Sequence, residues 1–297
     1  MLNSFKIGNF EDEGVGTGVT VIMARSGAVG GVSVRGKAPA TRETDLLRSE
    51  NSVDKVNAVV LSGGSAFGLD ACSGVVQYFH KKGLGYNAGA YRVPIVCGAS
   101  LYDLEYKTFG YPNADMGMLA CEYAHAFSEM NGSIGAGAGA TVGKILGMKC
   151  ASKSGLGVKC IKIGGLEMAA VVAVNAFGNV YDPNTSAFLK GATKNGMPLD
   201  IEPLLISGVE APLSAFGGNT TIGCIVTNAK LSKTECNRLA DAVHDAYARC
   251  IRPVHTAVDG DTVFVLASGE ADCNPLGIHA LAVDLMCQAI VSSVKDA

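Results

Sequence analysis

The sequence predicts a layered α/β fold in which helices cover buried sheets. Short and almost wholly apolar runs of strand length, such as Val56–Leu61 and Met168–Val174, are typical of strands buried on both faces. Longer segments between such runs carry apolar residues at helical spacing. The composition adds 38 glycines and no tryptophan in 297 residues, so the core must consist of small and aliphatic side chains with close backbone contacts.

Three strand-like runs occupy the first part of the chain: Gly18–Ala24, Gly30–Val34 and Val56–Leu61. The third run breaks into the turn Ser62–Ser65, after which apolar residues recur at helical spacing as far as Gly83. This order predicts a strand, a glycine turn and a long helix. A further short apolar run follows at Val93–Val96.

The second half repeats the pattern, with strands predicted at Met168–Val174, Thr220–Thr227 and Thr262–Ala267. Ser232 and Glu235 form a capping box that opens a helix reaching Cys250, and a last helix is predicted from about Leu276 to Val294. Residues 182–218 are rich in Pro, Gly and Ser without a period, which predicts a long exposed linker or excursion.

Composition excludes several classes of protein. Charged residues make up 17% and hydrophobic residues 48%, which excludes a disordered chain. A net charge of -3 argues against nucleic acid as the partner. We find no secretory signal and no run of 18 apolar residues, so no membrane partner is expected. The ten cysteines include no C-x-x-C pair, which predicts reduced, mostly buried thiols in the cytoplasm and no zinc site.

Two glycine-containing loops invite functional interpretations that their context does not support. Gly135–Ala140 fits a dinucleotide fingerprint, but no clear strand precedes it and no acid follows at the required distance, so close packing is favoured. Ser62–Gly68 is placed like a hydrolase nucleophile elbow, but Phe67 replaces the second glycine, which favours helix capping. The five histidines show no metal-ligand spacing, and we expect no cofactor.

The junction Phe216–Thr221 (FGGNTT) is a different kind of feature. Thr220 opens a predicted buried strand, and a rigid element is where a nucleophile is held accurately. A Thr hydroxyl needs a base, and cleavage of the preceding bond would free an α-amino group with a pKa of about 7.7–8.0 beside it. Spacing alone favours an ordinary strand start, because Thr-rich strand starts are common.

A set of short segments, taken together, resembles the family of L-aminopeptidase/D-esterase proteins, β-peptidyl aminopeptidases and nylon-oligomer hydrolases. The segments appear in order from Val34 to Phe264. They are Val34–Gly36, Thr41–Leu47, Leu61–Asp70, Gly135–Lys144, Val174–Gly178, Asn219–Gly223 and Asp259–Phe264.

The resemblance implies a single hydrolase domain over residues 1–297 with a four-layer αββα sandwich. This is the N-terminal-nucleophile-like fold with ornithine acetyltransferase-like topology. It also implies an inactive precursor that cuts itself between Asn219 and Thr220, giving an α chain (1–219) and a β chain (220–297) that stay together. Thr220 would then attack a substrate amide or ester and form an acyl-enzyme.

Further site residues carry over from the same resemblance. Asn175 matches the family's oxyanion donor. Asp259 and Asp261 match its acidic pair, which would orient the terminal ammonium and relay protons. Lys144 and Tyr102 match positions that nylon-oligomer hydrolases use to polarise and position the substrate.

We therefore expect a self-processing Thr hydrolase that cleaves amide bonds of small peptides or related compounds, more as an aminopeptidase than as an endo-type amidase. One alternative is an acyltransferase of the ornithine acetyltransferase type, which passes the acyl group to an amine. Another is a non-catalytic small-molecule-binding protein that uses the Gly135–Lys144 loop. The family also implies a homo-oligomer, for which a tetramer is one option.

Overall fold

A computed structural model of the chain describes residues 1–209, 218–295 and 297. Ten strands form one large sheet: β1 Phe5–Asp12, β2 Thr17–Val34, β3 Thr41–Arg42, β4 Lys55–Ser62, β7 Val96–Ser100, β8 Met130–Gly132, β11 Leu156–Ile163, β12 Leu166–Asn175, β17 Thr220–Ala229 and β19 Thr262–Ala271. The order across this sheet is β3-β7-β4-β2-β19-β17-β12-β11-β8, with β1 also paired to β2.

The helices and the small hairpins are attached to this sheet. The helices are α1 Ser65–Gly68, α2 Ala71–Lys81, α3 Ala114–Glu122, α4 Ile201–Ile206, α5 Lys233–Cys250 and α6 Pro275–Lys295, with short 3-10 turns η1 Asp45–Leu47 and η2 Gly135–Gly137. The short strands are β5 Tyr86–Asn87, β6 Arg92–Val93, β9 Thr141–Val142, β10 Ser152–Lys153, β13 Asn179–Tyr181, β14 Phe188–Lys190, β15 Thr193–Lys194, β16 Met197–Pro198 and β18 Ile251–Arg252.

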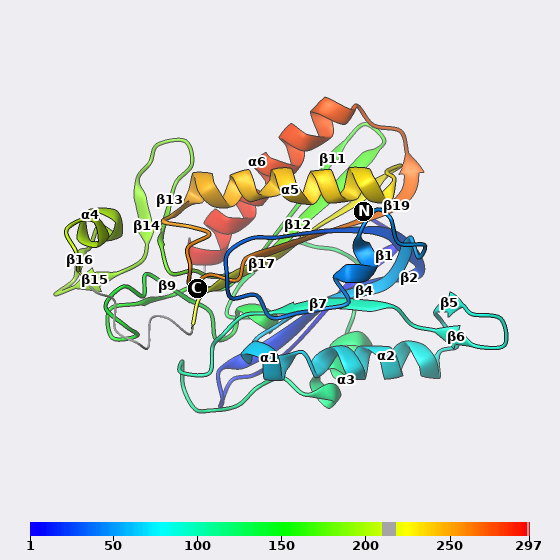
Figure 1. Ribbon diagram of the computed structural model, residues 1–297, viewed down its shortest axis with the longest axis horizontal. Helices are drawn as coiled ribbons and strands as arrows, with labels where there is room; N and C mark the ends of the chain where they lie inside the picture. Colours follow the sequence, from blue (N-terminus) through cyan, green and yellow to red (C-terminus); the bar gives the residue numbers. More distant parts are fainter. Residues whose placement is uncertain (210–217, 296) are drawn as a thin grey trace.

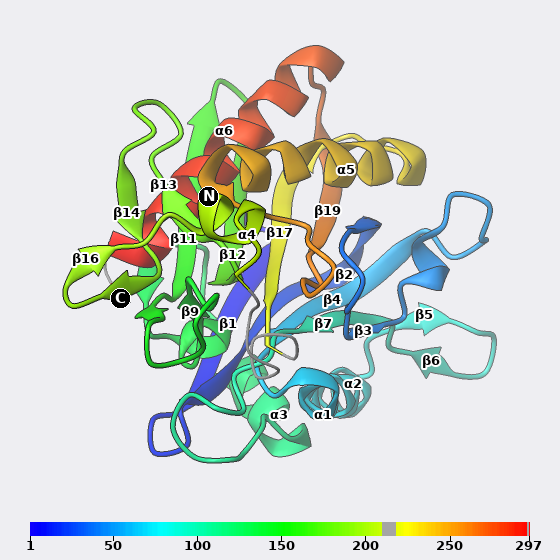
Figure 2. The ribbon, with the colours of Figure 1, turned by 60° about the vertical axis from the view of Figure 1, so that its left-hand side comes forward.

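The sheet folds back on itself and encloses a core between its two halves. Helices α5 and α6 cover one outer face, and α1, α2 and α3 cover the other (Figures 1 and 2). Three large clusters of buried apolar side chains separate the four layers, and the middle cluster joins residues of β1 and β4 to residues of β12, β17 and β19. This arrangement is the predicted αββα sandwich.

Strand β2 is the element that makes the fold-back possible. It has 18 residues, and its pairing with β4 shifts register between Met23 and Ala28, where a bulge interrupts the ladder. A bulge bends a strand and increases its twist, so β2 can pair with β4 in one half of the sheet and with β19 in the other. The two strand-like runs predicted in this region are parts of this one strand.

Strand β17 lies in the middle of the sheet, between β12 and β19. It pairs antiparallel with β12 and parallel with β19, and all ten of its residues are buried. A strand covered on both faces and both edges has little freedom to move, because every backbone group is paired and every side chain is packed. The first residue of this strand is Thr220, so the predicted nucleophile begins a rigid element.

Both long C-terminal helices were predicted, and the structure adds their packing. Ser232 accepts a hydrogen bond from the backbone N–H of Glu235, and Glu235 reaches back to Ser232, which confirms the capping box of α5. Helix α6 is long and apolar enough by length and composition to cross a membrane, with a mean hydropathy of 1.5. Half of that stretch is buried inside the protein, as in a core helix that packs on α5, β11 and β12.

Of the two alternatives predicted for residues 182–218, a structureless linker is wrong for the described part, which is an excursion from the main sheet with short elements of its own. Strands β14, β15 and β16 and helix α4 lie within residues 188–206. These elements have two to six residues each, which is too short for a sequence period to show. Phe216 and Gly217 of the junction, with the rest of residues 210–217, lie outside the described residues.

Candidate active site

Thr220 has its hydroxyl against the carbonyl group of the residue before it. The residue is 4% exposed and pairs with Asn175 at the end of the β12–β17 ladder. Its Oγ1 donates a hydrogen bond of 2.5 Å to the carbonyl oxygen of Asn219. The hydroxyl therefore lies beside the peptide group on its own amino side.

The carbonyl oxygen of Asn219 has a second donor. The backbone N–H of Gly260 donates to it at 3.1 Å, and Asn219 forms an isolated parallel bridge with Asp259. A side chain at position 260 would meet the carbonyl oxygen of Ala38 at 2.2 Å. Only glycine therefore lets the backbone of residue 38 pack this closely against the turn that carries the Gly260 N–H. Negative charge developing on the Asn219 oxygen would face a fixed N–H group.

The next carbonyl toward the N-terminus, that of Gly218, is held by two side chains. Lys144 Nζ donates to its oxygen at 2.5 Å and Asn175 Nδ2 at 3.0 Å. Lys144 Nζ also donates to Asn175 Oδ1 at 2.7 Å, and Asn175 Oδ1 accepts from the backbone N–H of Thr141 at 3.0 Å. These bonds fix which end of the Asn175 amide points at the carbonyl, so its N–H group is the donor there.

Burial controls the charge of Lys144. The side chain is 4% exposed, and burial lowers its pKa to about 7, against the raising effect of the nearby carboxylates of Asp259, Asp103 and Glu105. An amine with a pKa near neutrality can be either a charged donor or a neutral base. Lys144 is thus a titratable side chain that contacts the Gly218 carbonyl directly.

A small cavity of about 10 Å³ lies beside Lys144 and Gly218. Its lining is Tyr102, Asp103, Glu105, Tyr106, Gly139, Thr141, Lys144, Met148 and Gly218. Two carboxylates and two tyrosines line this water-sized space, and such groups suit the cationic or polar end of a ligand.

Two lining residues have defined partners. The Tyr102 hydroxyl donates to Glu105 at 3.2 Å, and the Tyr102 backbone carbonyl accepts from Asn175 Nδ2 at 2.8 Å. Asp103 accepts from the Thr17 hydroxyl and from the Gly64 N–H, both at 2.7 Å, and burial raises its pKa to about 6.

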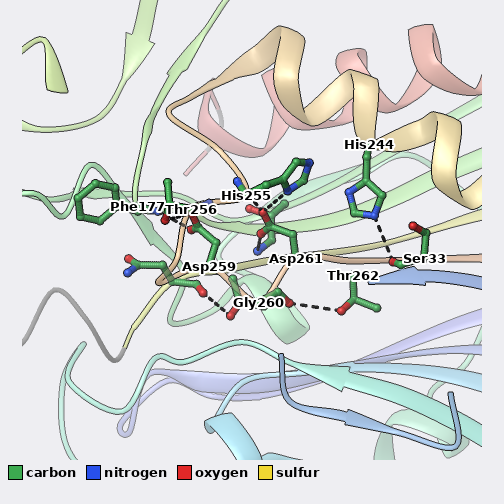
Figure 3. A network of polar contacts seen from close by, with 12 residues as sticks. Ser33, Phe177, His244, His255, Thr256, Asp259, Gly260, Asp261 and Thr262 are labelled. Carbon is green, nitrogen blue, oxygen red and sulfur yellow. Dashed lines mark hydrogen bonds and ion pairs between the residues drawn. The ribbon is translucent and has the colours of Figure 1, made fainter. Parts of the chain in front are cut away.

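The predicted acidic pair lies in the turn before β19 (Figure 3), and only Asp261 of the two bonds a backbone group next to Thr220 with its side chain among the described residues. Asp261 Oδ1 accepts from the Thr221 N–H at 2.7 Å. Asp259 accepts from the N–H of Thr256 at 2.9 Å and from the N–H of Phe177 at 3.4 Å. Burial, followed by the charge of Asp261, raises the pKa of Asp259 to about 6.

The predicted residues thus surround the 218–221 segment, but they contact it in different ways. Asn175 and Lys144 hold a carbonyl oxygen directly, Tyr102 acts through its backbone, and neither aspartate bonds Thr220 Oγ1 among the described residues. Sequence reasoning missed the Gly260 N–H, because a backbone donor leaves no signal in residue type. It also missed His255, whose bond to Asp261 depends on a turn that spacing does not reveal.

The Gly135–Lys144 loop is a packing element. All ten residues are buried, and a side chain at Gly137 would meet the backbone nitrogen of Leu156 at 2.0 Å. The loop therefore offers no open surface for a phosphate, which argues against the nucleotide interpretation. Among residues 1–209, 218–295 and 297, no three His, Cys, Asp or Glu side chains are grouped as metal ligands.

Comparison with known sequences gives a match over almost the whole chain. The sequence profile described as Peptidase family S58 matches residues 4–297. An uncharacterized aminopeptidase of Mycobacterium tuberculosis is 38% identical over an alignment that covers 94% of this chain and 86% of the relative. A 6-aminohexanoate-oligomer endohydrolase of a Kocuria species is 29% identical, covering 94% and 81%.

Solved structures give the same architecture at low identity. A β-aminopeptidase of a Burkholderia species superposes with a TM-score of 0.69 at 16% identity, covering 98% of this chain and 84% of that one. An L-aminopeptidase D-Ala-esterase/amidase of Ochrobactrum anthropi, described as a variant of the Ntn hydrolase fold, gives 0.69 at 14% identity with the same coverage. These similarities confirm the predicted fold class.

Proposed function

The chain belongs to peptidase family S58, and from that membership we propose that Thr220 is its nucleophile and frees itself by cutting the Asn219–Thr220 bond. The coarser conclusion, an aminopeptidase- or amidase-like hydrolase, follows from the family itself. The observation that carries the finer proposal is the 2.5 Å bond between Thr220 Oγ1 and the Asn219 carbonyl oxygen, at the start of a rigid strand.

The proposed self-cleavage has two steps, and this geometry supports the first. Thr220 Oγ1 attacks the carbonyl carbon of Asn219 while the Gly260 N–H stabilises the oxyanion. The C–N bond then breaks, the Thr220 nitrogen takes the hydroxyl proton, and an ester joins Asn219 to Oγ1. Water hydrolyses this ester, leaving a carboxylate on Asn219 and a free hydroxyl and amine on Thr220.

Turnover would use the same hydroxyl with a new base. The freed α-amine, with a reference pKa of about 7.7–8.0, takes the Oγ1 proton as the oxygen attacks the substrate carbonyl. The amine leaving group departs with a proton, and water hydrolyses the acyl-enzyme. Asn175 Nδ2 and Lys144 Nζ, the donors that hold the Gly218 carbonyl in the continuous chain, are the groups that would polarise the substrate carbonyl.

The substrate class follows from the pocket and the relatives. We infer short peptides and related amides, because Asp103 and Glu105, which line the cavity beside Lys144, suit an ammonium. The relatives are named as aminopeptidases and as an endohydrolase of 6-aminohexanoate oligomers, whose chains end in an amine. A free amino end near the scissile bond is therefore the feature that we expect to be recognised.

Denaturing electrophoresis tests the proposal. The processed protein should give bands of about 22 and 8 kDa, in proportion to 219 and 78 of the 297 residues of the 30.5-kDa chain. Thr220→Ala should give one uncut band and no amide hydrolysis. Thr220→Ser, the matched control, keeps the hydroxyl and should still be cut.

Two results would contradict the proposal. One is a wild-type protein that hydrolyses amides as an uncut chain. The other is a Thr220→Ala variant that is cut at the same bond. A dipeptide amide with a free amino end should be hydrolysed faster than its N-acetylated form, and the reverse order would overturn the substrate class.

A further inference from the structure

Behind the acidic pair lies a histidine that neither the family resemblance nor the proposed mechanism uses. His255 lies in the turn that connects β18 to β19, and its backbone has a φ of +53°. This left-handed conformation is uncommon for a residue other than glycine, so tertiary contacts must hold it. Figure 3 shows the His255 ring directly beside the Asp261 carboxylate.

His255 makes two bonds to one oxygen of Asp261. Its ring Nδ1 lies 2.7 Å from Asp261 Oδ2, and its backbone N–H donates to the same oxygen at 3.3 Å. Because an ionised carboxylate only accepts, the Nδ1 atom carries the proton in this bond. The other oxygen, Oδ1, accepts from the Thr221 N–H at 2.7 Å. Asp261 therefore joins the histidine to the residue that follows the nucleophile.

The ring of His255 is fixed from its other side by helix α5. The ring centroid of His244 lies 4.8 Å away with the planes at 75°, and that of Tyr247 lies 6.1 Å away. His244 is itself held by a bond of 3.1 Å between its Nε2 and the carbonyl oxygen of Ser33. The side chain of His255 is only 17% exposed, so its orientation toward Asp261 is set by packing.

We propose that His255 is a positioning residue for catalysis, which acts through Asp261 on the Thr221 N–H and so holds Thr220 in place for attack. The inference rests on the proposed function of Thr220. Before the cut, the 259–261 turn holds both peptide groups next to Thr220, because Gly260 also bonds the Asn219 carbonyl. After the cut, the Asn219 bond no longer restrains Thr220, whereas the Asp261 bond remains on the nucleophile's own chain.

The charge on Asp261 makes a partner necessary. This carboxylate is 1% exposed, and a buried carboxylate is retained in its ionised form only when hydrogen bonds satisfy its oxygens. Without the ring, Oδ2 would lose its shorter bond, and the Asp261 carboxylate would be free to turn. This rotation would loosen the bond to Thr221, and a shift of the nucleophile of about 1 Å can cost roughly 100-fold in rate.

Two substitutions of His255 separate positioning from backbone strain. His255→Gly removes the donor, and His255→Asn keeps an amide N–H near the place of Nδ1; both residues tolerate a φ of +53°. We expect kcat for a dipeptide amide to fall about 10- to 100-fold in His255→Gly, with KM changed less than threefold. His255→Asn should restore kcat to within about fivefold of the wild type.

The matched control is His125→Asn, a substitution at an exposed histidine whose ring Nδ1 bonds the carbonyl group of Ala126. Its kcat should stay within about twofold of the wild type. Thermal unfolding of each variant is measured together with turnover, and the comparison uses processed protein. The two bands confirm that every variant has passed the self-cleavage step.

The experiment distinguishes failure of the role proposed for His255 from failure of the function proposed for Thr220. If the wild type is processed and active but His255→Gly keeps its kcat, the positioning role is wrong and the nucleophile assignment stands. A His255→Asn variant that is as slow as His255→Gly at equal thermal stability also overturns it. If the wild type is active without processing, both proposals fall together.

Discussion

Two groups of polar residues meet at the segment 218–221, and they hold it differently. On one side, the side chains of Lys144 and Asn175 converge on the Gly218 carbonyl oxygen. On the other side, the turn before β19 bonds backbone groups next to Thr220, through the Gly260 N–H and the Asp261 carboxylate. The first group is arranged to polarise a carbonyl, and the second to fix the nucleophile. Substitutions should therefore separate carbonyl activation from nucleophile placement.

Among the residues that hold the 218–221 segment, we expect Asn175→Asp to reduce kcat the most. The substitution keeps the shape and an oxygen for the Thr141 N–H, but it removes the N–H donor that points at the carbonyl. Loss of one preorganised donor of this kind costs about 10²–10³ in kcat. Steady-state kinetics of the processed variant measures this change in kcat. A fall of less than about tenfold would mean that Asn175 does not polarise the substrate carbonyl.

Lys144→Met should reduce kcat by about 100-fold and raise stability at the same time. The pKa of the buried amine is lowered from 10.5 to about 7, so between these values the unfolded chain binds the proton and the folded chain does not. Wild-type stability should therefore rise from pH 7 toward pH 10.5, and the advantage of the Met variant should shrink over that range. Thermal unfolding at pH 6, 8 and 10 measures the difference. An advantage that does not change with pH would contradict the lowered pKa.

We expect Asp259→Asn, in the turn on the other side of the 218–221 segment, to reduce the rate of catalysis less than the two substitutions above. Burial and the charge of Asp261 raise the pKa of Asp259 to about 6, so this carboxylate loses its charge as the pH falls through 6. Wild-type kcat/KM should decrease below that pH. The variant should be about tenfold slower at pH 8, the equivalent of about one pKa unit of charge stabilisation. Its pH profile should lack the acidic limb near 6, and an unchanged limb would assign that titration to another group.

The elements that the sequence predicted best are those with strong local signals. Val56–Leu61 and Met168–Val174 are continuous apolar runs, and they became β4 and β12. The capping box at Ser232 located the start of α5. Strand β11 was missed because charged residues interrupt its apolar ones, and helix α3 because its nine residues show a weak period. Pairing across the bulge of β2 depends on tertiary contacts that no local pattern records.

In the candidate site, too, some residues were predicted from the sequence and others depend on tertiary contacts. The family resemblance predicted Asn175 and Lys144 as site residues. The structure adds that both donate hydrogen bonds to the Gly218 carbonyl oxygen. Gly260 contributes a backbone N–H, which any residue type carries, so its position in the turn had to be seen. His255 approaches Asp261 only because the chain turns back between them, and α5 supplies the packing that orients its ring.

Determination of the new N-terminus tests the self-cleavage most directly. We predict that the smaller band, sequenced from its amino end, begins with Thr220-Thr221-Ile222, and that the larger fragment has the mass of residues 1–219. A smaller fragment that starts at any other residue, or an active protein that remains one chain of 297 residues, would contradict the assignment of Thr220 as the nucleophile.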